Sequence, residues 1–211
     1  MAKIALFGST GRIGQRILNE ALARGHEVTA IVRDATRKSD KRPNLTFKPG
    51  DVLKPESVAA ATVGHDVVVS AYGPGAGDPK QLVTAAEALL EGVSTHQPMR
   101  LIVVGGAGSL EVSPGVQLAD TPDFPAAWKG AALGHRDALG VFRKSGLDWT
   151  YVSPAALIEP GKRTGQYRLG TDQLLRDEKG ESRISMEDYA KAIVDEIETP
   201  RFRRQRFTVA Y

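Results

Sequence analysis

Short apolar runs alternate with longer segments of helical periodicity over the first half of the chain. Residues 12–24 carry Ile13, Ile17, Leu18 and Leu22 at the three- and four-residue spacing of an amphipathic helix. The apolar runs between such segments have the length of buried strands, and this alternation is typical of βαβ units and a parallel sheet. We expect strands over 3–8, 27–33, 45–51, 65–72 and 100–106, and helices over 12–24, 55–62 and 80–93.

The regular alternation ends after Gly106. Residues 107–127 are rich in Gly, Pro and Asp, and we expect a long loop there, which in a folded domain is usually functional or mobile. Ser185 followed by Asp188 has the pattern of a capping box that opens a helix. The second half of the chain then predicts a helix over 128–145, a strand over 147–154, loop and short strand over 159–183, a helix over 186–198 and a last strand over 204–211.

These elements predict an α/β fold of the Rossmann type. The expected sheet is parallel and doubly wound, with six or seven strands, helices on both faces and a small C-terminal elaboration over its carboxyl edge. A length of 211 residues favours one NAD(P)-binding domain over the whole chain, 1–211. The elements on the substrate side are expected mainly in 107–127 and 153–183.

A glycine-rich loop follows the first predicted strand and opens the first predicted helix. It reads Gly8-Ser9-Thr10-Gly11-Arg12-Ile13-Gly14, inside a βαβ unit of about 30 residues, which is the context that dinucleotide binding requires. Gly8 would permit the tight turn, Gly11 would let the backbone approach a pyrophosphate, and Gly14 would let the helix pack on the strand. The pyrophosphate would bind free N–H groups at the positive end of the helix dipole. The alternative is a glycine-rich turn without a ligand.

The end of the second predicted strand bears on the choice between NAD and NADP. An NAD site uses an acidic residue here to bind the ribose 2′-hydroxyl. This strand ends at Arg33, with Arg37 one helical turn further and Arg12 in the glycine loop, and guanidiniums around one point suit a 2′-phosphate. Asp34 would favour NAD if its carboxylate turned inward. We expect NADPH as the preferred cofactor and NAD as the alternative.

Two further loops at the carboxyl ends of strands fit the cofactor, because ligands of open α/β sheets bind outside these ends. Asp51 would accept a hydrogen bond from the adenine amino group while Val52 packs on the ring. The alternative is that Asp51 caps the helix opened near Pro55. The end of the fourth strand would lie beside the pyrophosphate and ribose, through Ala71, Tyr72 and Gly73.

Composition excludes several classes of function. The chain has no cysteine, which removes disulfides, thiolate nucleophiles and Cys-ligated metals, and no His/Asp/Glu cluster has metal-ligand spacing. No apolar stretch approaches the length of a membrane span, and the first residues lack a signal-peptide pattern. The net charge of +3 is too small to indicate nucleic acid. We expect a cytoplasmic monomer or homodimer whose partner is a small molecule, with no nucleic acid, membrane or metal.

The catalytic pair of standard short-chain dehydrogenases is missing. The spacing of the glycine loop, G-x-x-G-x-x-G, is similar to that of this superfamily, whose standard members carry Tyr-x-x-x-Lys after the fifth strand. That Tyr protonates the carbonyl oxygen as hydride reaches the carbon. The helix over 128–145 contains no Tyr, and its nearest match is His135 with Leu139. Ordinary ketone or alcohol chemistry therefore lacks its acid.

Ordered motifs connect the chain to a known family. They are GSTGRIG at 8–14, GGAGSL at 105–110, LDWTYVSPA at 147–155, PGKRTGQYRLGTDQLL at 160–175 and SRISMEDYAKAIVDEIE at 182–198. With these motifs the whole chain resembles the atypical short-chain dehydrogenases described as NADH-flavin reductases. A more distant similarity is to biliverdin-IXβ/flavin reductase, where the segment that matches VRDATR at 32–37 turns both arginines to the 2′-phosphate.

The resemblance implies hydride transfer from NAD(P)H to a flavin. A flavin accepts hydride at N5 and spreads the charge over its ring, so the protein mainly holds two rings in contact. In the biliverdin relative, two loops border the acceptor, and they match Gly105, Gly106 and Ser109 after the fifth strand and Pro154 and Ala156 after the sixth. We include Gly105, Gly106 and Pro154 among the cofactor contacts. That relative has Ser at Gly106 and His at Ala156, and their absence argues against tetrapyrrole reduction.

Three polar side chains are candidates for catalytic contact with the substrate. Ser109 could donate a hydrogen bond to a substrate carbonyl or could be a turn residue. His135 could lie near the nicotinamide or the acceptor, or on the exposed face of its helix. Tyr167, next to Arg168 in a Gly-rich segment, could cover the pocket or belong to a structural hairpin. Trp149 is expected in the core.

The leading hypothesis is a reductase that passes hydride from NADPH to a flavin, with FMN or FAD as substrate, or to a quinone-like ring. A nicotinamide-binding sensor or regulatory protein without turnover is the main alternative, since it is similar to some atypical members that lack the Tyr. An epimerase or dehydratase-like enzyme is the third, and the missing Tyr-x-x-x-Lys argues against it.

Overall fold

The centre of the computed structural model, which describes residues 1–36, 40–75, 77–95 and 99–211, is an eight-stranded sheet. The strand order is β10-β12-β8-β5-β4-β1-β2-β3. Its strands are β1 (Lys3–Phe7), β2 (Glu27–Val32), β3 (Leu45–Pro49), β4 (Val67–Ser70), β5 (Arg100–Val104), β8 (Trp149–Pro154), β10 (Arg168–Gly170) and β12 (Gln205–Ala210). All neighbours in this sheet pair in parallel except β10, which pairs antiparallel with β12 at the edge.

The strand order confirms the doubly wound α/β fold. From β1 the chain runs outward to β2 and β3, returns to β4 beside β1, and then builds the other half through β5, β8 and β12. The order therefore reverses between β1 and β4, and ligands of such sheets bind outside the carboxyl ends at this point. The sheet is larger than the six or seven strands expected, because the Gly-rich segment 159–183 contributes β10.

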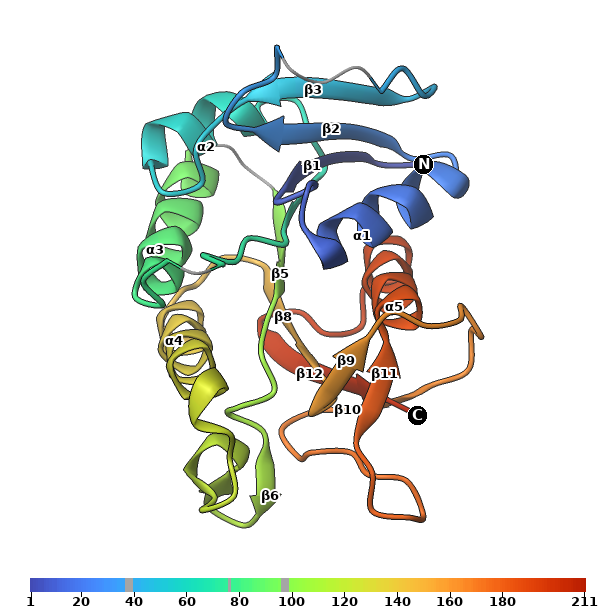
Figure 1. Cartoon of the computed structure of the whole chain (residues 1–211). Helices are drawn as coiled ribbons and strands as arrows, with labels where there is room; N and C mark the ends of the chain where they lie inside the picture. The colour runs from blue at the N-terminus through green and yellow to red at the C-terminus, as the bar shows by residue number, and fades with distance from the viewer. Residues whose placement is uncertain (37–39, 76, 96–98) are drawn as a thin grey trace.

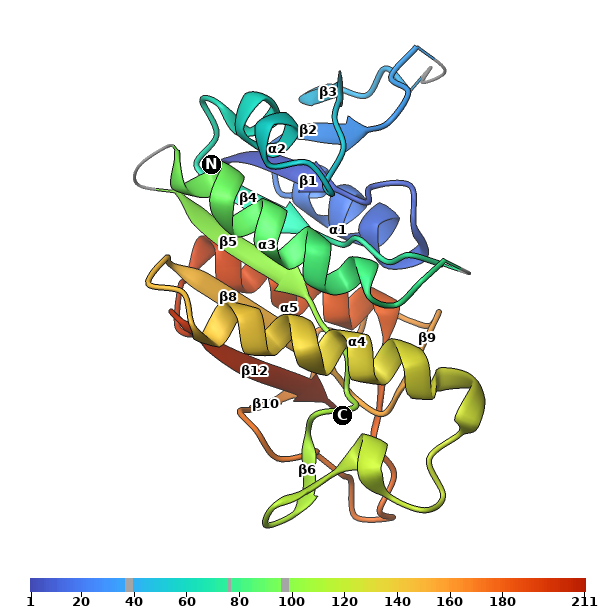
Figure 2. The same cartoon turned by 90° about the vertical axis from the view of Figure 1, so that its left-hand side faces the viewer.

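Helices cover both faces of the sheet, as Figures 1 and 2 show from two sides. One face carries α1 (Arg12–Ala23) and α5 (Met186–Glu198), and the other carries α2 (Pro55–Thr62), α3 (Gln81–Ser94) and α4 (Ala126–Arg143). Alternation along β1 divides the core accordingly, with Ile4 and Leu6 on the first face and Ala5 and Phe7 on the second. No helix in the described part of the chain is long and apolar enough to cross a membrane.

The helix ends follow local sequence signals. Gly25, with a φ of 79°, lies just past the end of α1, as a glycine at this position commonly does. The Ser185 hydroxyl accepts a hydrogen bond from the Asp188 N–H and caps α5, as predicted. The Asp188 carboxylate has another function: it accepts hydrogen bonds from Thr164 and Gly165. This contact fixes the segment before β10 to α5.

The segments that follow β5 and β8 lie together in the lower part of Figure 1. Residues 107–127, expected as a loop, contain a hairpin of β6 (Glu111–Ser113) and β7 (Val116–Gln117) and the 3-10 helix η1 (Leu118–Asp120), while β9 (Leu157–Glu159) pairs with β11 (Arg183–Ser185). The Glu111 N–H donates to the Asp172 carbonyl, and the Leu174 N–H donates to the Glu111 carbonyl. The two segments expected on the substrate side therefore pack on each other.

Candidate functional site

The glycine loop joins β1 to α1 with a geometry that two of its glycines make possible. Gly8 has a φ of 75°, and a Cβ there would lie 2.4 Å from the carbonyl oxygen of Ala71. A Cβ on Gly14 would lie 2.0 Å from the carbonyl oxygen of Gly8. The N–H of Gly11 donates to that same oxygen over 3.0 Å. The tight turn and the close helix packing that we predicted for Gly8 and Gly14 are both present.

Gly11 differs from these two glycines. A Cβ there would approach only the Gly8 oxygen, at 3.3 Å, so the protein's own packing barely requires a glycine. Gly11 is the N-cap of α1, no side chain of the described residues caps this helix, and its first turn has no acidic residue. The positive end of the helix dipole is thus left to a ligand at a position without a side chain. This arrangement can hold a pyrophosphate.

Ser9 adds a second feature that favours a ligand at this loop. The residue is 3% exposed, and its hydroxyl has no hydrogen-bond partner among the described residues. An unpaired buried hydroxyl costs roughly 1–3 kcal/mol, and a ligand oxygen would remove that cost. Thr10 and Arg12 in the same loop are exposed, and Ile13 is half-buried against the core.

The ribose end of the expected site contains two exposed cations. Arg33 follows β2 directly, and Arg12 is the first residue of α1. The Asp34 carboxylate accepts hydrogen bonds from the N–H and the hydroxyl of Thr36, at 3.0 and 2.6 Å, and so shapes the turn after β2. Arg37, the third predicted guanidinium, lies outside the described residues. Arg12 and Arg33 are the two of the three predicted guanidiniums that lie within the described residues.

Tyr72, which follows β4, lies within electrostatic reach of charged residues that follow β2 and β3. Its hydroxyl donates to Oε1 of Gln81 over 2.7 Å. Burial and the Asp51 carboxylate raise the pKa of Tyr72, and the Arg33 guanidinium opposes them. The ends of β2, β3 and β4 are therefore close enough for their polar groups to interact, as one extended ligand would require.

Asp51 does not cap the following helix, and that alternative is wrong. The N-cap of α2 is Lys54, while Oδ1 of Asp51 accepts from the N–H of Leu53 over 3.0 Å. Val52 is buried beside it, whereas Gly73 at the end of β4 is exposed. The contact of Asp51 and Val52 with an adenine stays a prediction.

Gly105 and Gly106, after β5, make room for two rings. A Cβ on Gly105 would lie 2.1 Å from the ring of Tyr151, and a Cβ on Gly106 would lie 3.0 Å from the side chain of His135. Pro154 ends β8 and is buried. These glycines therefore have a packing function that is independent of any cofactor.

Tyr151 of β8 holds His135 of α4. The Tyr151 hydroxyl donates to the His135 carbonyl over 2.9 Å and lies 3.0 Å from Nδ1 of the same residue. Burial lowers the pKa of His135 to about 4, so the imidazole is neutral near pH 7. His135 also lines a cavity of about 20 Å³ with Ser70 and Tyr72, which has room for about one water molecule. The imidazole thus faces the carboxyl ends of β4 and β5, and its placement on the exposed face of the helix is wrong.

Ser109 is a turn residue with a structural partner. Its hydroxyl is buried and accepts a hydrogen bond from Nη1 of Arg206 over 2.8 Å. Arg206, on β12, is 5% exposed and pairs with Asp172 of the second substrate-side segment. Ser109 thus connects the turn after β5 to β12, which lies two strands away in the same sheet.

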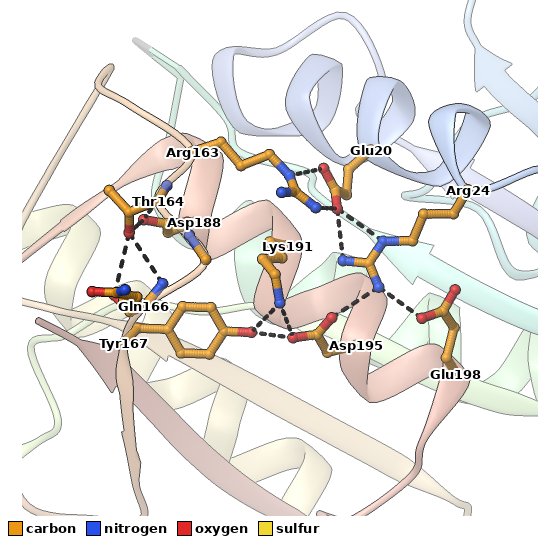
Figure 3. A network of polar contacts seen from close by, with 11 residues as sticks. Glu20, Arg24, Arg163, Thr164, Gln166, Tyr167, Asp188, Lys191, Asp195 and Glu198 are labelled. Carbon is orange, nitrogen blue, oxygen red and sulfur yellow. Dashed lines mark hydrogen bonds and ion pairs between the residues drawn. The ribbon is translucent and has the colours of Figure 1, made fainter.

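Tyr167 lies on the opposite face of the sheet from His135, in the polar network of Figure 3. Its hydroxyl donates to Asp195 of α5, and Nζ of Lys191 is 2.8 Å from the same carboxylate. The network continues over α1 and α5 through Glu20, Arg24, Arg163 and Glu198. The three catalytic candidates therefore do not form one group.

Sequence reasoning missed Tyr151 and Arg206. Both lie inside apolar strands, which the hydrophobic pattern marks as core. Two signals were available: a basic residue within the apolar run of β12, and a pair of glycines after β5, which often accommodates a large ring from a neighbouring strand.

Comparison with known proteins places the chain in a family. The chain belongs to the NAD(P)H-binding family whose model matches residues 8–200. The uncharacterized Bacillus subtilis protein YwnB is 40% identical, over 98% of this chain and 97% of that protein. A solved structure of a proposed exported protein from Burkholderia pseudomallei is 53% identical over 100% of both chains, with a TM-score of 0.92. A proposed NADH-flavin reductase from Streptococcus pneumoniae is 35% identical over 100% of this chain and 99% of that chain, with a TM-score of 0.89.

These findings confirm the resemblance that the sequence motifs indicated. NAD(P)H is the ligand of the family, and its model covers the glycine loop and the strands of the sheet from β2 to β10 in chain order, while β1 and β12 lie outside the matched residues. The cytoplasmic location stays a prediction, because the Burkholderia relative is described as exported.

Proposed function

We propose that this protein is an oxidoreductase that transfers hydride from NADPH to a flavin or a quinone-like ring. The observation that carries the proposal is the loop 8–14, with an uncapped helix N-terminus, a buried Ser9 hydroxyl without a partner, and a glycine at 11 that packing barely requires. The exposed Arg33 stands where NAD sites have an acid, and it supports NADPH over NADH.

The residues that would hold the cofactor run along the carboxyl ends of the strands. Gly8, Ser9 and Gly11 would bind the pyrophosphate, and Arg12 and Arg33 the 2′-phosphate. Contacts to the adenine, the ribose and the nicotinamide would follow in that order, through Asp51, Val52, Ala71, Tyr72, Gly73, Gly105, Gly106 and Pro154. NADPH would supply the hydride.

The acceptor side supports a ring over a ketone. The Ser109 hydroxyl accepts a hydrogen bond from Arg206 and, as an aliphatic alcohol, is a very weak acid, Tyr167 lies on the other face of the sheet, and His135 is neutral near pH 7. None of these three candidates is placed to protonate an alkoxide at neutral pH. A flavin or quinone spreads the incoming charge over its ring and does not require a strong acid at that moment, whereas a ketone does.

Stopped-flow measurement of NADPH oxidation tests the proposal. We expect FMN, FAD or a naphthoquinone to oxidise protein-bound NADPH, and simple ketones and aldehydes to be poor acceptors. The Gly11→Val variant serves as the control for background reaction in solution. A ketone that reacts faster than every flavin and quinone would contradict the hydride-to-ring reaction.

A sensor without turnover is the second candidate, and a specific observation favours it. The Tyr167 hydroxyl donates its hydrogen to Asp195, and the Ser109 hydroxyl accepts from Arg206, so both have structural partners, as in a protein that binds a nucleotide without acting on it. The same experiment decides between the two, since a sensor would bind NADPH and leave it unoxidised with every acceptor.

A further inference from the structure

His135 keeps one ring nitrogen available for a ligand. The Tyr151 hydroxyl has a single hydrogen, which it donates to the His135 carbonyl. Nδ1 of His135, 3.0 Å from the hydroxyl oxygen, must then be the donor in that contact. A neutral imidazole with its proton on Nδ1 carries a lone pair on Nε2. Within the described residues Nε2 has no hydrogen-bond partner.

The surroundings hold the imidazole in place. The Tyr151 hydroxyl contacts both the carbonyl and Nδ1 of His135. A Cβ on Gly106 would lie 3.0 Å from the His135 side chain, which shows how closely the glycine covers it. Phe142 packs on Tyr151 with 5.9 Å between ring centroids. The ring that carries this hydroxyl is therefore fixed beside His135.

His135 lies beside the loop that follows β5. A Cβ on Gly106 would lie 3.0 Å from Cδ2 of its ring, and the residue also lines a small cavity between α3, α4 and the sheet, with Ser70 at the carboxyl end of β4 and Val104 at that of β5. These ends lie next to the switch point between β1 and β4, beyond the pyrophosphate loop. A nicotinamide or a flat ring stacked on it would occupy this side of the crevice.

We propose that Nε2 of His135 accepts a hydrogen bond from an amide or imide N–H of a bound ring, and that Tyr151 is the positioning residue that fixes this acceptor. The identity of the rings rests on the proposed function. Two sources have this chemistry: the carboxamide of the nicotinamide and the imide of an isoalloxazine. With the isoalloxazine imide as the donor, the proposal also deepens the function, because it selects a flavin over a plain quinone, which has only acceptors.

Two matched pairs of ligands distinguish the sources. Lumiflavin and N3-methyl-lumiflavin differ at the single ring N–H of the oxidised flavin, and NADP⁺ and its 3-acetylpyridine analogue differ at the carboxamide NH₂. Dissociation constants are measured by calorimetry for the nucleotides and by flavin fluorescence, with saturating NADP⁺, for the flavins. We expect one pair to show a loss of roughly three- to tenfold when the N–H is removed, the worth of one hydrogen bond.

Two substitutions of His135 assign that loss to Nε2. The discrimination should disappear in His135→Leu and persist in His135→Gln, whose amide oxygen can replace Nε2 as acceptor. A wild-type protein that discriminates neither pair overturns the proposal. Discrimination that survives in His135→Leu overturns it as well.

Nitrogen NMR reads the tautomer without any ligand. The chain has four histidines, and with their ring nitrogens labelled with ¹⁵N, the signal that disappears in His135→Gln belongs to His135. We expect this signal to show a proton on Nδ1 in the wild type. A proton on Nε2 overturns the proposal. Tyr151→Phe keeps the ring and should give a mixture of tautomers with weaker ligand discrimination. None of these measurements needs turnover, so a protein that binds NADPH but reduces no flavin would refute the proposed function, while the role of His135 is decided by binding and NMR.

Discussion

The two sides of the crevice are built on opposite principles. On the β1–β3 side, polar groups are left without protein partners among the described residues, as the N-terminus of α1 and the Ser9 hydroxyl are, and Arg33 is exposed. On the β5–β12 side, ionisable side chains are held by protein partners, as Arg206 is by Asp172 and His135 by Tyr151. We expect a ligand to complete the first side, whereas protein contacts already fix most of the second.

This difference separates the effects expected from substitutions. Changes on the cofactor side should alter binding and leave the fold intact, because few protein contacts depend on those groups. Changes on the acceptor side should alter stability first, because buried charged and aromatic groups lose partners there. An acceptor-side substitution that changes ligand binding and leaves stability unchanged would contradict this difference between the two sides.

The largest effect is expected on the cofactor side, from Gly11→Val. The valine side chain would occupy the expected phosphate position, and NADPH affinity should fall by at least about 100-fold, or about 2.7 kcal/mol. The melting temperature should change little, because a Cβ there meets only the Gly8 oxygen at 3.3 Å. Calorimetry and thermal unfolding measure both quantities, with Gly14→Ala as the contrasting variant that should destabilise the fold. Unchanged affinity in a folded Gly11→Val protein would refute the site.

The next effect is expected on the acceptor side, from Asp172→Asn. This change removes the charge that pairs with the buried Arg206 guanidinium. Because Asp172 is half-exposed, at 51%, the free energy of unfolding should fall by about 1–2 kcal/mol in urea titrations. Arg206→Met removes the buried charge itself and leaves Asp172 to water. It should therefore cost less than Asp172→Asn, and the reverse order would contradict the role of Asp172 as the partner of the buried guanidinium.

The same contrast explains what the sequence could predict. The turn at 8–14 is local, so seven consecutive residues define it, and the strand and helix periods predicted the fold around it. The acceptor side depends on distant pairs: His135 and Tyr151 are 16 residues apart, and Ser109 and Arg206 are 97 apart. Hydrophobic periodicity contains no information on such pairs. Short strand material was expected over 159–183, but β10 was not placed in the main sheet, because three residues at a sheet edge are too short to show an alternating pattern.

The dependence of stability on pH tests whether His135, on the acceptor side, is buried in its neutral form. The pKa of His135 is lowered by burial from an ordinary 6.5 to about 4, so between these values the unfolded chain binds more protons than the folded one. Its contribution to stability is complete above pH 6.5 and is lost as the pH falls to about 4, by at most about 3 kcal/mol.

Urea midpoints at two pH values isolate this contribution. Wild type should lose more stability than His135→Gln between about pH 7.5 and about pH 4.5. Carboxylates that titrate in this range act in both proteins and cancel in the difference. Parallel losses in the two proteins would show that His135 is not buried in the neutral form. NADPH oxidation should show no steep change near neutral pH for the same reason.

On the cofactor side, Arg33→Asp should reverse the preference between NADPH and NADH. The loss of a charge-assisted contact of about 1.5–3 kcal/mol corresponds to roughly tenfold or more in the NADPH dissociation constant. Salt should weaken the wild-type preference. Arg203→Asp is the control for net charge, because Arg203 is exposed and pairs with Asp148. Equal dissociation constants for NADH and NADPH in the wild type would contradict a 2′-phosphate site.

The smallest effect on turnover is expected from Tyr167→Phe, which tests whether Tyr167 belongs to the acceptor site. The Tyr167 hydroxyl donates a hydrogen bond to Asp195, and Nζ of Lys191 lies over the Tyr167 ring. Both contacts are on the face of the sheet that α5 covers, away from His135. Removing the hydroxyl should cost about 1 kcal/mol of stability, the worth of one hydrogen bond, and should leave NADPH oxidation by FMN within about twofold of wild type, far from the 10²–10⁴ of an essential acid. Stopped-flow rates and urea midpoints on the same preparation measure the two effects together.

A drop of about 100-fold or more in a fully folded variant would mean that Tyr167 reaches the reacting ring as a proton donor. The reaction would then require an acid after all, and hydride transfer to a ring without one would be the wrong mechanism.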